Sequence, residues 1–157
     1  MDPRIIVIAR TLNEAHNITD FCTNYSFADK ILITDGGSTD GTVTLARRFD
    51  KVEVKDVSHL QVPLDGAPGG FVTPEAEQTN ILIDWAMEER ADWIIRDDID
   101  CWPNSHLRRR ARQLFATVKL PSIFVYRLYL WGDDQWFPEM SRPGQSLWAW
   151  KPAEIDI

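Results

Sequence analysis

A cluster of acidic side chains directly follows an apolar run in the middle of the chain. Residues 93–95, Trp-Ile-Ile, are typical of a buried strand, and Asp97, Asp98 and Asp100 come immediately after them. Carboxylates this close together repel one another, so the cluster is costly unless a cation neutralises its charge. Mg²⁺ and Mn²⁺ prefer oxygen ligands and often take one or two carboxylates, with water and phosphate as the remaining ligands. Asp98 and Asp100 therefore predict a divalent cation, Mn²⁺ or Mg²⁺, shared with a diphosphate.

Two other interpretations of the acidic cluster need to be weighed. The acids can form a solvated surface turn, paired with Arg96 or with arginines farther along the chain. A calcium-binding loop is excluded, because Trp102 occupies the next ligand position and Pro103 replaces the glycine that such a loop needs. The surface turn stays open as an alternative, while the position of the cluster after a predicted strand favours the cation.

A second polar cluster, DGGSTDGT at residues 35–42, also follows an apolar run. Gly36 and Gly41 have the spacing of a P-loop, but Thr42 stands where that motif has lysine, and the G-x-G-x-x-G fingerprint is absent. The glycines let a ligand approach the backbone. Asp35 can accept a hydrogen bond from a nucleobase N–H, such as N3 of uracil. The alternative is an ordinary turn in which Asp35 acts as a cap.

Strand and helix patterns alternate through the first two thirds of the chain. Strands are expected at residues 4–9, 30–34, 52–54, 93–96, 123–130 and 147–150, and helices at 75–89, around 107–118, after a cap at Thr11 or Asn13, and after a cap at Ser38 or Asp40. The alternation predicts an α/β fold, a three-layer αβα sandwich with a mostly parallel central sheet. Ligands of such sheets bind at the carboxyl ends of the strands, so the two polar clusters are expected to meet in one crevice.

Apolar spacing also predicts which helix faces are buried. The expected sets are Ile18, Phe21, Cys22 and Tyr25, then Ile81, Leu82, Trp85 and Ala86, then Leu107, Ala111, Leu114, Phe115 and Val118. Residues 58–74 are rich in proline and glycine, and this long segment is expected to be a lid or a disordered connection.

Length and charge limit the classes of protein to consider. The chain has 157 residues, which predicts one domain, and its net charge of −7 disfavours a nucleic-acid-binding protein. No apolar run approaches the ~20 residues of a transmembrane segment, and the N-terminus lacks the pattern of a signal peptide. With only Cys22 and Cys101, far apart in sequence, a reduced, cytoplasmic chain is expected.

Three stretches together resemble glycosyltransferase family 2, which has the GT-A fold of nucleotide-diphosphosugar transferases. They are IIVIARTLNEAHNI, ADKILITDGGSTDGT and QTNILIDWAMEERADWIIRDDID, and the likeness covers residues 4–104 in order. It implies one GT-A-like domain over 1–157, with a nucleotide-sugar-binding half at 1–104 and an acceptor-side half at 105–157. The implied activity is a metal-dependent, inverting transfer of sugar from a nucleotide-sugar donor, a UDP-sugar being expected, to a hydroxyl of a saccharide or glycan acceptor.

The resemblance also assigns roles to single positions. The implied donor-binding residues are Ala9, Thr11, Asn13, Glu14, Asp35, Gly36, Gln78 and Asp98, and the implied metal ligands are Asp98 and Asp100. The chain departs from the family pattern at Leu12, where an aromatic residue often stacks on the base. It also has Gln78 and Thr79 where many members place a basic residue near the phosphates, and a late histidine metal ligand is missing.

A base must take the proton of the acceptor hydroxyl. The resemblance places this base after the D-x-D, where Asp133, Asp134 and Glu139 are the candidates. Glu139 is favoured because it follows Pro138 and has aromatic neighbours; the alternative is an ordinary surface glutamate. Indole rings suit sugar faces, so the four tryptophans at 131, 136, 148 and 150 are candidate platforms, with packing against the sheet as the alternative.

Two further classes of function remain open. A chain shorter than its relatives is compatible with a non-catalytic nucleotide-sugar or glycan-binding module. A sugar-phosphate nucleotidyltransferase shares a related architecture, but ARTLNEAHN lacks the glycine-rich, basic loop of that class. The arginines of HLRRRARQL are expected to form a solvated helix face, although they could attract a phosphorylated acceptor or a membrane surface.

Overall fold

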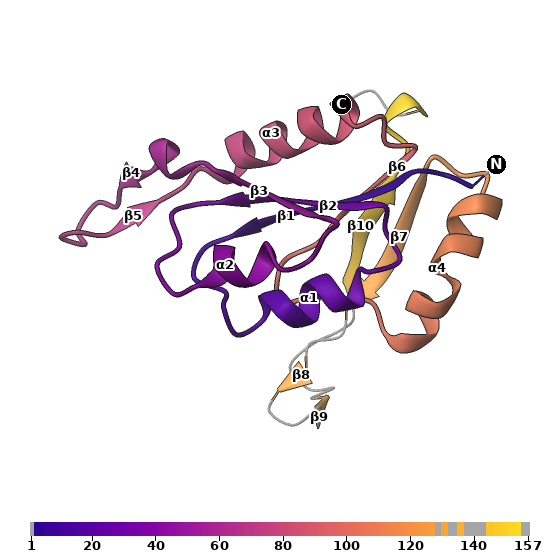
Figure 1. The fold of residues 1–157 in the computed structure, drawn as a ribbon, viewed down its shortest axis with the longest axis horizontal. Coiled ribbons are helices and arrows are strands. Elements are labelled where there is room, and N and C mark those ends of the chain that lie inside the picture. Colours follow the sequence, from indigo (N-terminus) through magenta and orange to yellow (C-terminus); the bar gives the residue numbers. More distant parts are fainter. Residues whose placement is uncertain (1, 128–129, 132–134, 137–143, 155–157) are drawn as a thin grey trace.

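A six-stranded, mostly parallel sheet forms the centre of the protein (Figure 1). The structure is a computed structural model that describes residues 2–127, 130–131, 135–136 and 144–154. The strands are β1 (Ile5–Thr11), β2 (Lys30–Asp35), β3 (Val52–Asp56), β6 (Trp93–Arg96), β7 (Ser122–Arg127) and β10 (Gly144–Trp150). Their order is β3-β2-β1-β6-β10-β7, and only β10 runs antiparallel to its neighbours.

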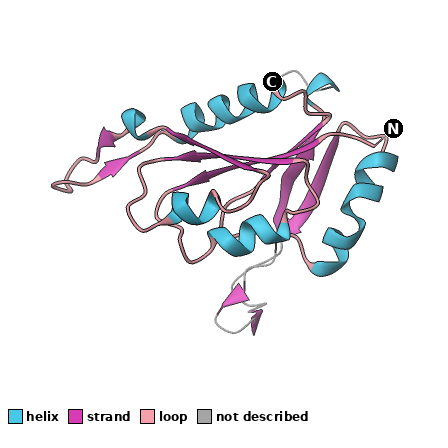
Figure 2. Ribbon diagram, in the orientation of Figure 1, coloured by secondary structure: helices cyan, strands magenta, loops and turns pink. Residues whose placement is uncertain are grey.

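Helices cover both faces of this sheet (Figure 2). One face carries α1 (Ile18–Asn24), α2 (Thr42–Ala46) and α4 (Ser105–Thr117), and the other carries α3 (Glu75–Glu88). Side chains of a strand alternate between faces, so Val7 packs with α1 and α4 whereas Ile8 packs with α3. The predicted αβα sandwich is therefore confirmed. No helix in the described part of the chain has the length and apolar character to cross a bilayer.

The predicted buried face of α1 is confirmed, and that of α3 only in part. In α1 and its C-cap, Ile18, Phe21, Cys22 and Tyr25 are all at most 1% exposed. In α3, Leu82 and Ala86 are buried, but Ile81 and Trp85 are only half-buried. The ammonium of Lys55 in the edge strand β3 lies 4.4 Å from the centre of a Trp85 ring, so this indole makes a cation–π contact with Lys55.

The helix caps differ from the prediction at two places. Thr11 still belongs to β1, where it pairs with Asp35, and Asn13 has a positive φ of 57° in the loop before α1. The Asn13 side chain accepts a hydrogen bond from the backbone N–H of Thr39 at 2.9 Å, so it holds the neighbouring loop and caps no helix. Gly41 precedes α2, and Asp40 contributes by accepting the N–H of Thr42 at 3.0 Å.

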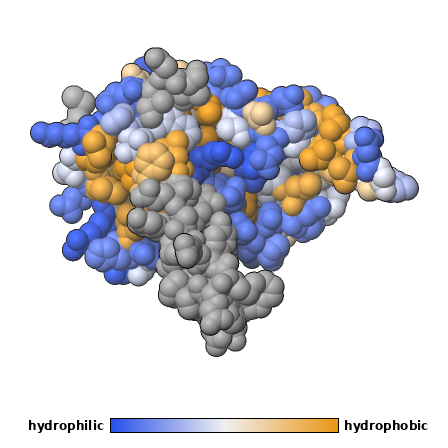
Figure 3. Space-filling view, turned by 180° about the vertical axis from the view of Figure 1, so that it is seen from behind, coloured by the Kyte–Doolittle hydropathy of each residue, from blue (hydrophilic) through white to orange (hydrophobic). Residues whose placement is uncertain are grey.

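Residues 58–74 form a hairpin, so the expectation of a disordered connection was wrong. After a 3₁₀ turn at Ser58–Leu60, β4 (Val62–Pro63) pairs with β5 (Phe71–Val72). The hairpin projects from one end of the sheet, and apolar surface gathers over it (Figures 1 and 3). A shallow, open pocket of about 660 Å³ is lined by the residues of this hairpin.

The last segments differ in extent from the predicted strands. β7 ends at Arg127, before the expected end at residue 130, and a small hairpin of β8 (Leu130–Trp131) and β9 (Gln135–Trp136) follows. β10 begins at Gly144 and lies between β6 and β7, and a 3₁₀ turn at Pro152–Glu154 follows it.

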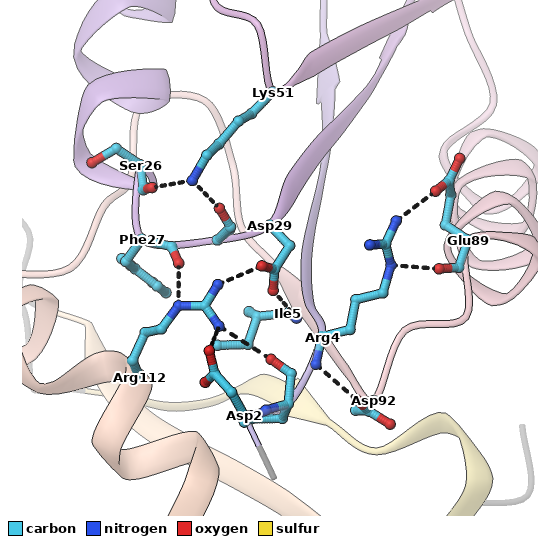
Figure 4. A network of polar contacts seen from close by, with 12 residues as sticks. Asp2, Arg4, Ile5, Ser26, Phe27, Asp29, Lys51, Glu89, Asp92 and Arg112 are labelled. Atoms are coloured by element: carbon cyan, nitrogen blue, oxygen red, sulfur yellow. Dashed lines mark hydrogen bonds and ion pairs between the residues drawn. The ribbon is translucent and has the colours of Figure 1, made fainter.

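Charged side chains join the segments at the amino end of β1 (Figure 4). Arg112 of α4 donates to Asp29 at 2.5 Å and to Asp2 at 3.1 Å, and Asp29 also accepts the backbone N–H of Ile5 at 2.8 Å. Arg4 donates to Glu89 at the end of α3 at 2.8 Å. These contacts fix the amino ends of the parallel strands, and a cleft lies at the opposite ends of β1 and β6.

Candidate functional site

A cleft of about 680 Å³ lies at the carboxyl ends of β1 and β6. Its walls come from the end of β1 with the loop after it, Gly36 after β2, the segment Phe71–Gln78, and the end of β6 with the acidic loop. Gly36 and the acid pair belong to the two polar clusters of the sequence, so both clusters meet at one cleft as predicted. Parallel sheets bind ligands at this edge, because the strand ends and the loops after them converge there.

The acidic loop brings Asp98 and Asp100 together on the cleft wall. Their carboxylate oxygens and the Cys101 sulfur all lie within 4.8 Å of one another. Asp100 is exposed and Asp98 is half-buried, and the Cys101 thiol donates to an Asp100 oxygen at 3.5 Å. Two carboxylates fit Mg²⁺ or Mn²⁺ when water and a diphosphate complete the shell, whereas a thiolate suits softer ions. The donor set thus fits a hard divalent cation held by Asp98 and Asp100.

Two arginines line the same cleft and were not among the predicted donor-binding residues. Arg10 bridges Glu75 at 3.0 Å and Asp98 at 3.9 Å. Arg96 pairs with Ile8 in the β1–β6 register, so Arg10 and Arg96 both lie on the α3 side of the sheet. Arg96 lines the cleft and forms no ion pair within the described residues, so the surface-turn alternative does not hold in its version with Arg96 as the partner of the acids. The cleft therefore holds positive charge next to its carboxylates.

Asp35 lies beside the cleft with its carboxylate turned toward its own loop. It is 4% exposed, and its oxygens accept the backbone N–H groups of Gly37 and Ser38 at 3.0 and 2.9 Å and the Ser38 hydroxyl at 2.5 Å. Asp35 thus caps its own turn, as in the alternative interpretation of DGGSTDGT. Recognition of a nucleobase by Asp35 stays a prediction. Gly36 does line the cleft, where a Cβ would meet the Thr73 hydroxyl oxygen at 3.0 Å.

The predicted residues of the first loop take different places. Ala9 is 2% exposed and packs in the core on the α1 side, away from the cleft walls. Thr11 and Glu14 line the cleft, whereas Asn13 serves the loop contact with Thr39. Gln78 lines the cleft but is 5% exposed, and its amide donates to the Thr73 carbonyl at 3.2 Å.

Two buried hydroxyls on the cleft walls lack a hydrogen-bond partner. Within the described residues these are the side-chain oxygens of Thr11 and Thr73. Buried polar groups are ordinarily paired, so an unpaired one needs an explanation. Phe71, Val72 and Thr73 were missed as cleft residues because they belong to the segment expected to be a lid or disordered, and the lid alternative was their only sequence signal. Glu75 was missed because it was expected only as the first residue of a helix.

Trp148 and Trp150 are core residues, and the possibility that they form sugar platforms is excluded by their burial. Trp148 is 2% exposed and its ring lies 5.6 Å from that of Phe115; Trp150 is 6% exposed and packs on the α3 side. Glu139, Asp133 and Asp134 lie outside the described residues. The side chains of Trp131 and Trp136 also lie outside the part of the chain whose side chains are described.

A buried carboxylate lies directly behind the acidic loop. Asp97 is 7% exposed and accepts a hydrogen bond from the Tyr25 hydroxyl. Burial, and then the charge of Asp97, raise the pKa of Tyr25 well above its ordinary value, so this phenol remains protonated at neutral pH. Nothing along the chain distinguishes Asp97 from Asp98 and Asp100, because all three follow the same apolar run.

The fold and the place of the cleft define an α/β protein with a cleft where parallel strands end, the edge at which such sheets bind ligands. No family model and no curated protein matches the chain. Among solved structures, S. aureus TarS 1–349, a glycosyltransferase, is similar with a TM-score of 0.50 and 19% identity. The match covers 71% of this chain and only 32% of the TarS chain. At this identity the similarity shows the fold alone, which is glycosyltransferase-like.

Proposed function

We propose that this chain is a glycosyltransferase that moves a sugar from a UDP-sugar to an acceptor hydroxyl, with inversion and with a divalent cation. One observation carries the proposal. In a glycosyltransferase-like fold, the strand-end cleft holds Asp98 and Asp100 close together, with Arg10 and Arg96 on the same walls. Two neighbouring carboxylates can bind a divalent cation, and the guanidinium of Arg96 beside them can bind a phosphate. Together these groups suit a diphosphate that carries a divalent cation.

Arg96 is the group of this chain best placed to hold a phosphate oxygen. It lines the cleft, it lies beside β1, and within the described residues no carboxylate neutralises it. Guanidinium groups bind phosphate through two parallel hydrogen bonds, which makes them specific as well as strong. This arginine supplies the positive charge that the sequence lacks at Gln78 and Thr79.

The nucleoside is proposed to lie against the end of β1. Gly36 lines the cleft there, and the unpaired hydroxyls of Thr11 and Thr73 can pair with ligand oxygens if the loop shifts. Asp35 lies behind Gly36 and needs such a shift before it can accept the N–H of uracil, because its oxygens now serve Gly37 and Ser38.

The proposed reaction is a single displacement at the anomeric carbon. The acceptor oxygen forms the new bond as the bond from the anomeric carbon to the diphosphate oxygen breaks, and that electron pair leaves with UDP. The acceptor proton passes to a carboxylate base, for which Glu139 remains the prediction. When bound, the cation would supply positive charge to the leaving diphosphate, and Arg96 is proposed to steady the same group.

The test is release of nucleoside diphosphate from a panel of nucleotide sugars with Mn²⁺, with and without a chelator. UDP release from one donor that stops with chelator is expected, and Asp100→Ala should abolish it. Asp84→Ala, an exposed acid of α3, is the matched control and should leave turnover unchanged. Arg96→Gln should raise the donor KM roughly 10-fold, whereas Arg110→Gln on the exposed face of α4 should not.

Three results would contradict the proposal in different ways. Donor binding without turnover across a broad acceptor set would indicate a binding module. Pyrophosphate release from a nucleoside triphosphate and a sugar phosphate would indicate a nucleotidyltransferase. Turnover that survives Asp100→Ala and chelation would remove the cation from the proposal.

A further inference from the structure

A chain of buried hydrogen bonds runs from β10 to the acidic loop. The indole N–H of Trp148 donates to the Tyr25 hydroxyl oxygen at 3.2 Å, and the Tyr25 hydroxyl donates to one carboxylate oxygen of Asp97. The other oxygen of Asp97 accepts the backbone N–H of Asp98 at 3.1 Å. These contacts join three segments that are distant in sequence: the end of α1, the end of β6 and strand β10.

The cost of burying these polar groups suggests that they have a specific role. Tyr25, Trp148 and Asp97 are 0%, 2% and 7% exposed. A buried carboxylate is expensive even when hydrogen-bonded, and apolar residues of similar volume often stabilise a core as well or better. Packing alone therefore gives no reason for an acid at position 97.

The position of Asp97 relates it directly to the cation-binding pair. Asp97 is the first residue after β6, and its backbone N–H still contacts the carbonyl of Ile8 in β1 at 3.4 Å. The next turn is closed by the N–H of Cys101, which donates to the carbonyl of Asp98 at 2.9 Å. Asp97 thus fixes the start of a turn whose side chains include both Asp98 and Asp100.

We propose that Asp97 is a positioning residue for the cation-binding pair Asp98 and Asp100, and that Trp148 holds it in place through Tyr25. The proposal rests on the proposed function in one respect, that Asp98 and Asp100 hold the cation. Asp97 acts through the backbone of the turn and does not touch the cation. The same hydrogen bonds connect the acidic loop to β10, so a shift of β10 would change the positions of Asp98 and Asp100.

The test is the affinity for Mn²⁺ in the presence of UDP, measured by calorimetry on the full chain. Asp97→Asn leaves a single acceptor oxygen, whereas the carboxylate uses one oxygen for Tyr25 and the other for the backbone of Asp98. Mn²⁺ should then bind about 10- to 100-fold more weakly, which is the usual effect of losing a residue that orients metal ligands. Tyr25→Phe removes a single hydroxyl and should weaken binding in the same direction by a smaller factor. Trp148→Phe removes the N–H donor and should resemble Tyr25→Phe.

Matched controls separate this role from a merely structural one. Asp92→Asn changes an acid at the other end of β6, which accepts the backbone N–H of Arg4 at 2.7 Å, and Trp93→Phe removes an indole from the same core as Trp148. Both should leave the Mn²⁺ dissociation constant unchanged. A structural role would lower the unfolding temperature or the active fraction and leave that constant alone.

Each outcome decides the matter. Weaker Mn²⁺ binding in folded Tyr25→Phe and Asp97→Asn, with both controls unchanged, supports the proposal. Equal dissociation constants in the wild type and these two variants overturn it while the proposed function stands. Absence of Mn²⁺ binding to the wild type overturns both this inference and the proposed cation. Mn²⁺ binding that follows the expected pattern, with no sugar transfer, overturns the proposed function alone.

Discussion

At the scale of single residues, Asp40 shows how a side chain can organise the cleft margin without lining it. One of its oxygens accepts the backbone N–H of Ala15 at 2.9 Å, and the other accepts the N–H of Thr42 at 3.0 Å and its hydroxyl at 2.5 Å. It therefore joins the loop after β1 to the loop after β2. The hydrogen bond from the Thr42 hydroxyl, followed by that from Ala15, lowers the pKa of Asp40 below its ordinary value.

Asp40 should make part of the stability depend on pH. Because its folded pKa is lowered, it stabilises the fold above its ordinary value of 3.8, and this contribution is lost as the pH falls further and the group is protonated. Urea unfolding of the wild type and Asp40→Asn should show a difference in the free energy of unfolding at pH 7 that shrinks by pH ~3. Asp50→Asn, at an exposed acid, is the control. A difference that is constant over this range would contradict the prediction.

Residue chemistry alone placed some site residues and misplaced others. Asp98 and Asp100 follow a buried strand, and strand ends of a parallel sheet point to the ligand edge, so their meeting in the cleft was predictable. The orientation of Asp35 was not, because the choice between its own turn and a ligand depends on backbone geometry that composition does not specify. In the surface-turn alternative Arg96 was one possible partner of the acids, but it forms no ion pair within the described residues.

At the scale of elements, α4 begins immediately after the acidic loop and limits where that loop can end. Asn104 caps the helix by accepting the backbone N–H of Leu107 at 2.9 Å. Pro103, which precedes it, is buried, and the helix then buries Ala111 and Phe115 against the sheet. The short connection from Asp100 to the helix is therefore held at its start by the hydrogen bond from Cys101 to Asp98 and at its end by the Asn104 cap.

Asn104→Ala should lower the free energy of unfolding by about 1 kcal/mol, because the first turn of α4 loses the acceptor for one of its free N–H groups. Asn80→Ala, in the exposed interior of α3, is the matched control and should be neutral or slightly stabilising, since alanine has the higher helix propensity. Urea unfolding followed by circular dichroism measures both. A loss at Asn80 as large as that at Asn104 would show that the effect is not one of capping.

At the scale of the whole molecule, the amino and carboxyl ends of the parallel strands differ: the amino ends are joined by ion pairs, and the carboxyl ends border the cleft. At the amino end, Arg112 donates to the carbonyl of Phe27 at 3.1 Å and to the carboxylates of Asp2 and Asp29 (Figure 4). These bonds hold α4 to the segments that precede β1 and β2. The carboxyl end carries the cleft, where the buried hydroxyls of Thr11 and Thr73 have no hydrogen-bond partner within the described residues.

Arg112→Ala should lower the free energy of unfolding by about 1–2 kcal/mol, because several hydrogen bonds to charged and backbone groups are lost from a site that is partly open to water. Arg112→Lys should recover only part of this loss, since an ammonium cannot reproduce the planar fork of the guanidinium. Arg110→Ala on the exposed side of α4 is the control. Donor turnover by the folded fraction should be unchanged, and a fall in that turnover would contradict the separation of the two ends.

The sequence by itself determined the layers of this protein and the edge of the sheet where its polar cleft lies. Apolar runs of strand length and helical periodicities are local, and a chain that alternates them has few ways to bury both. Only the tertiary structure decided that Trp148 is core, that residues 58–74 form a hairpin against the cleft, and that Asp97 is buried while Asp100 is exposed. These outcomes depend on contacts between distant segments, such as β10 beside β6 and Tyr25 against Asp97. Such contacts cannot be predicted from the spacing of residues along the chain.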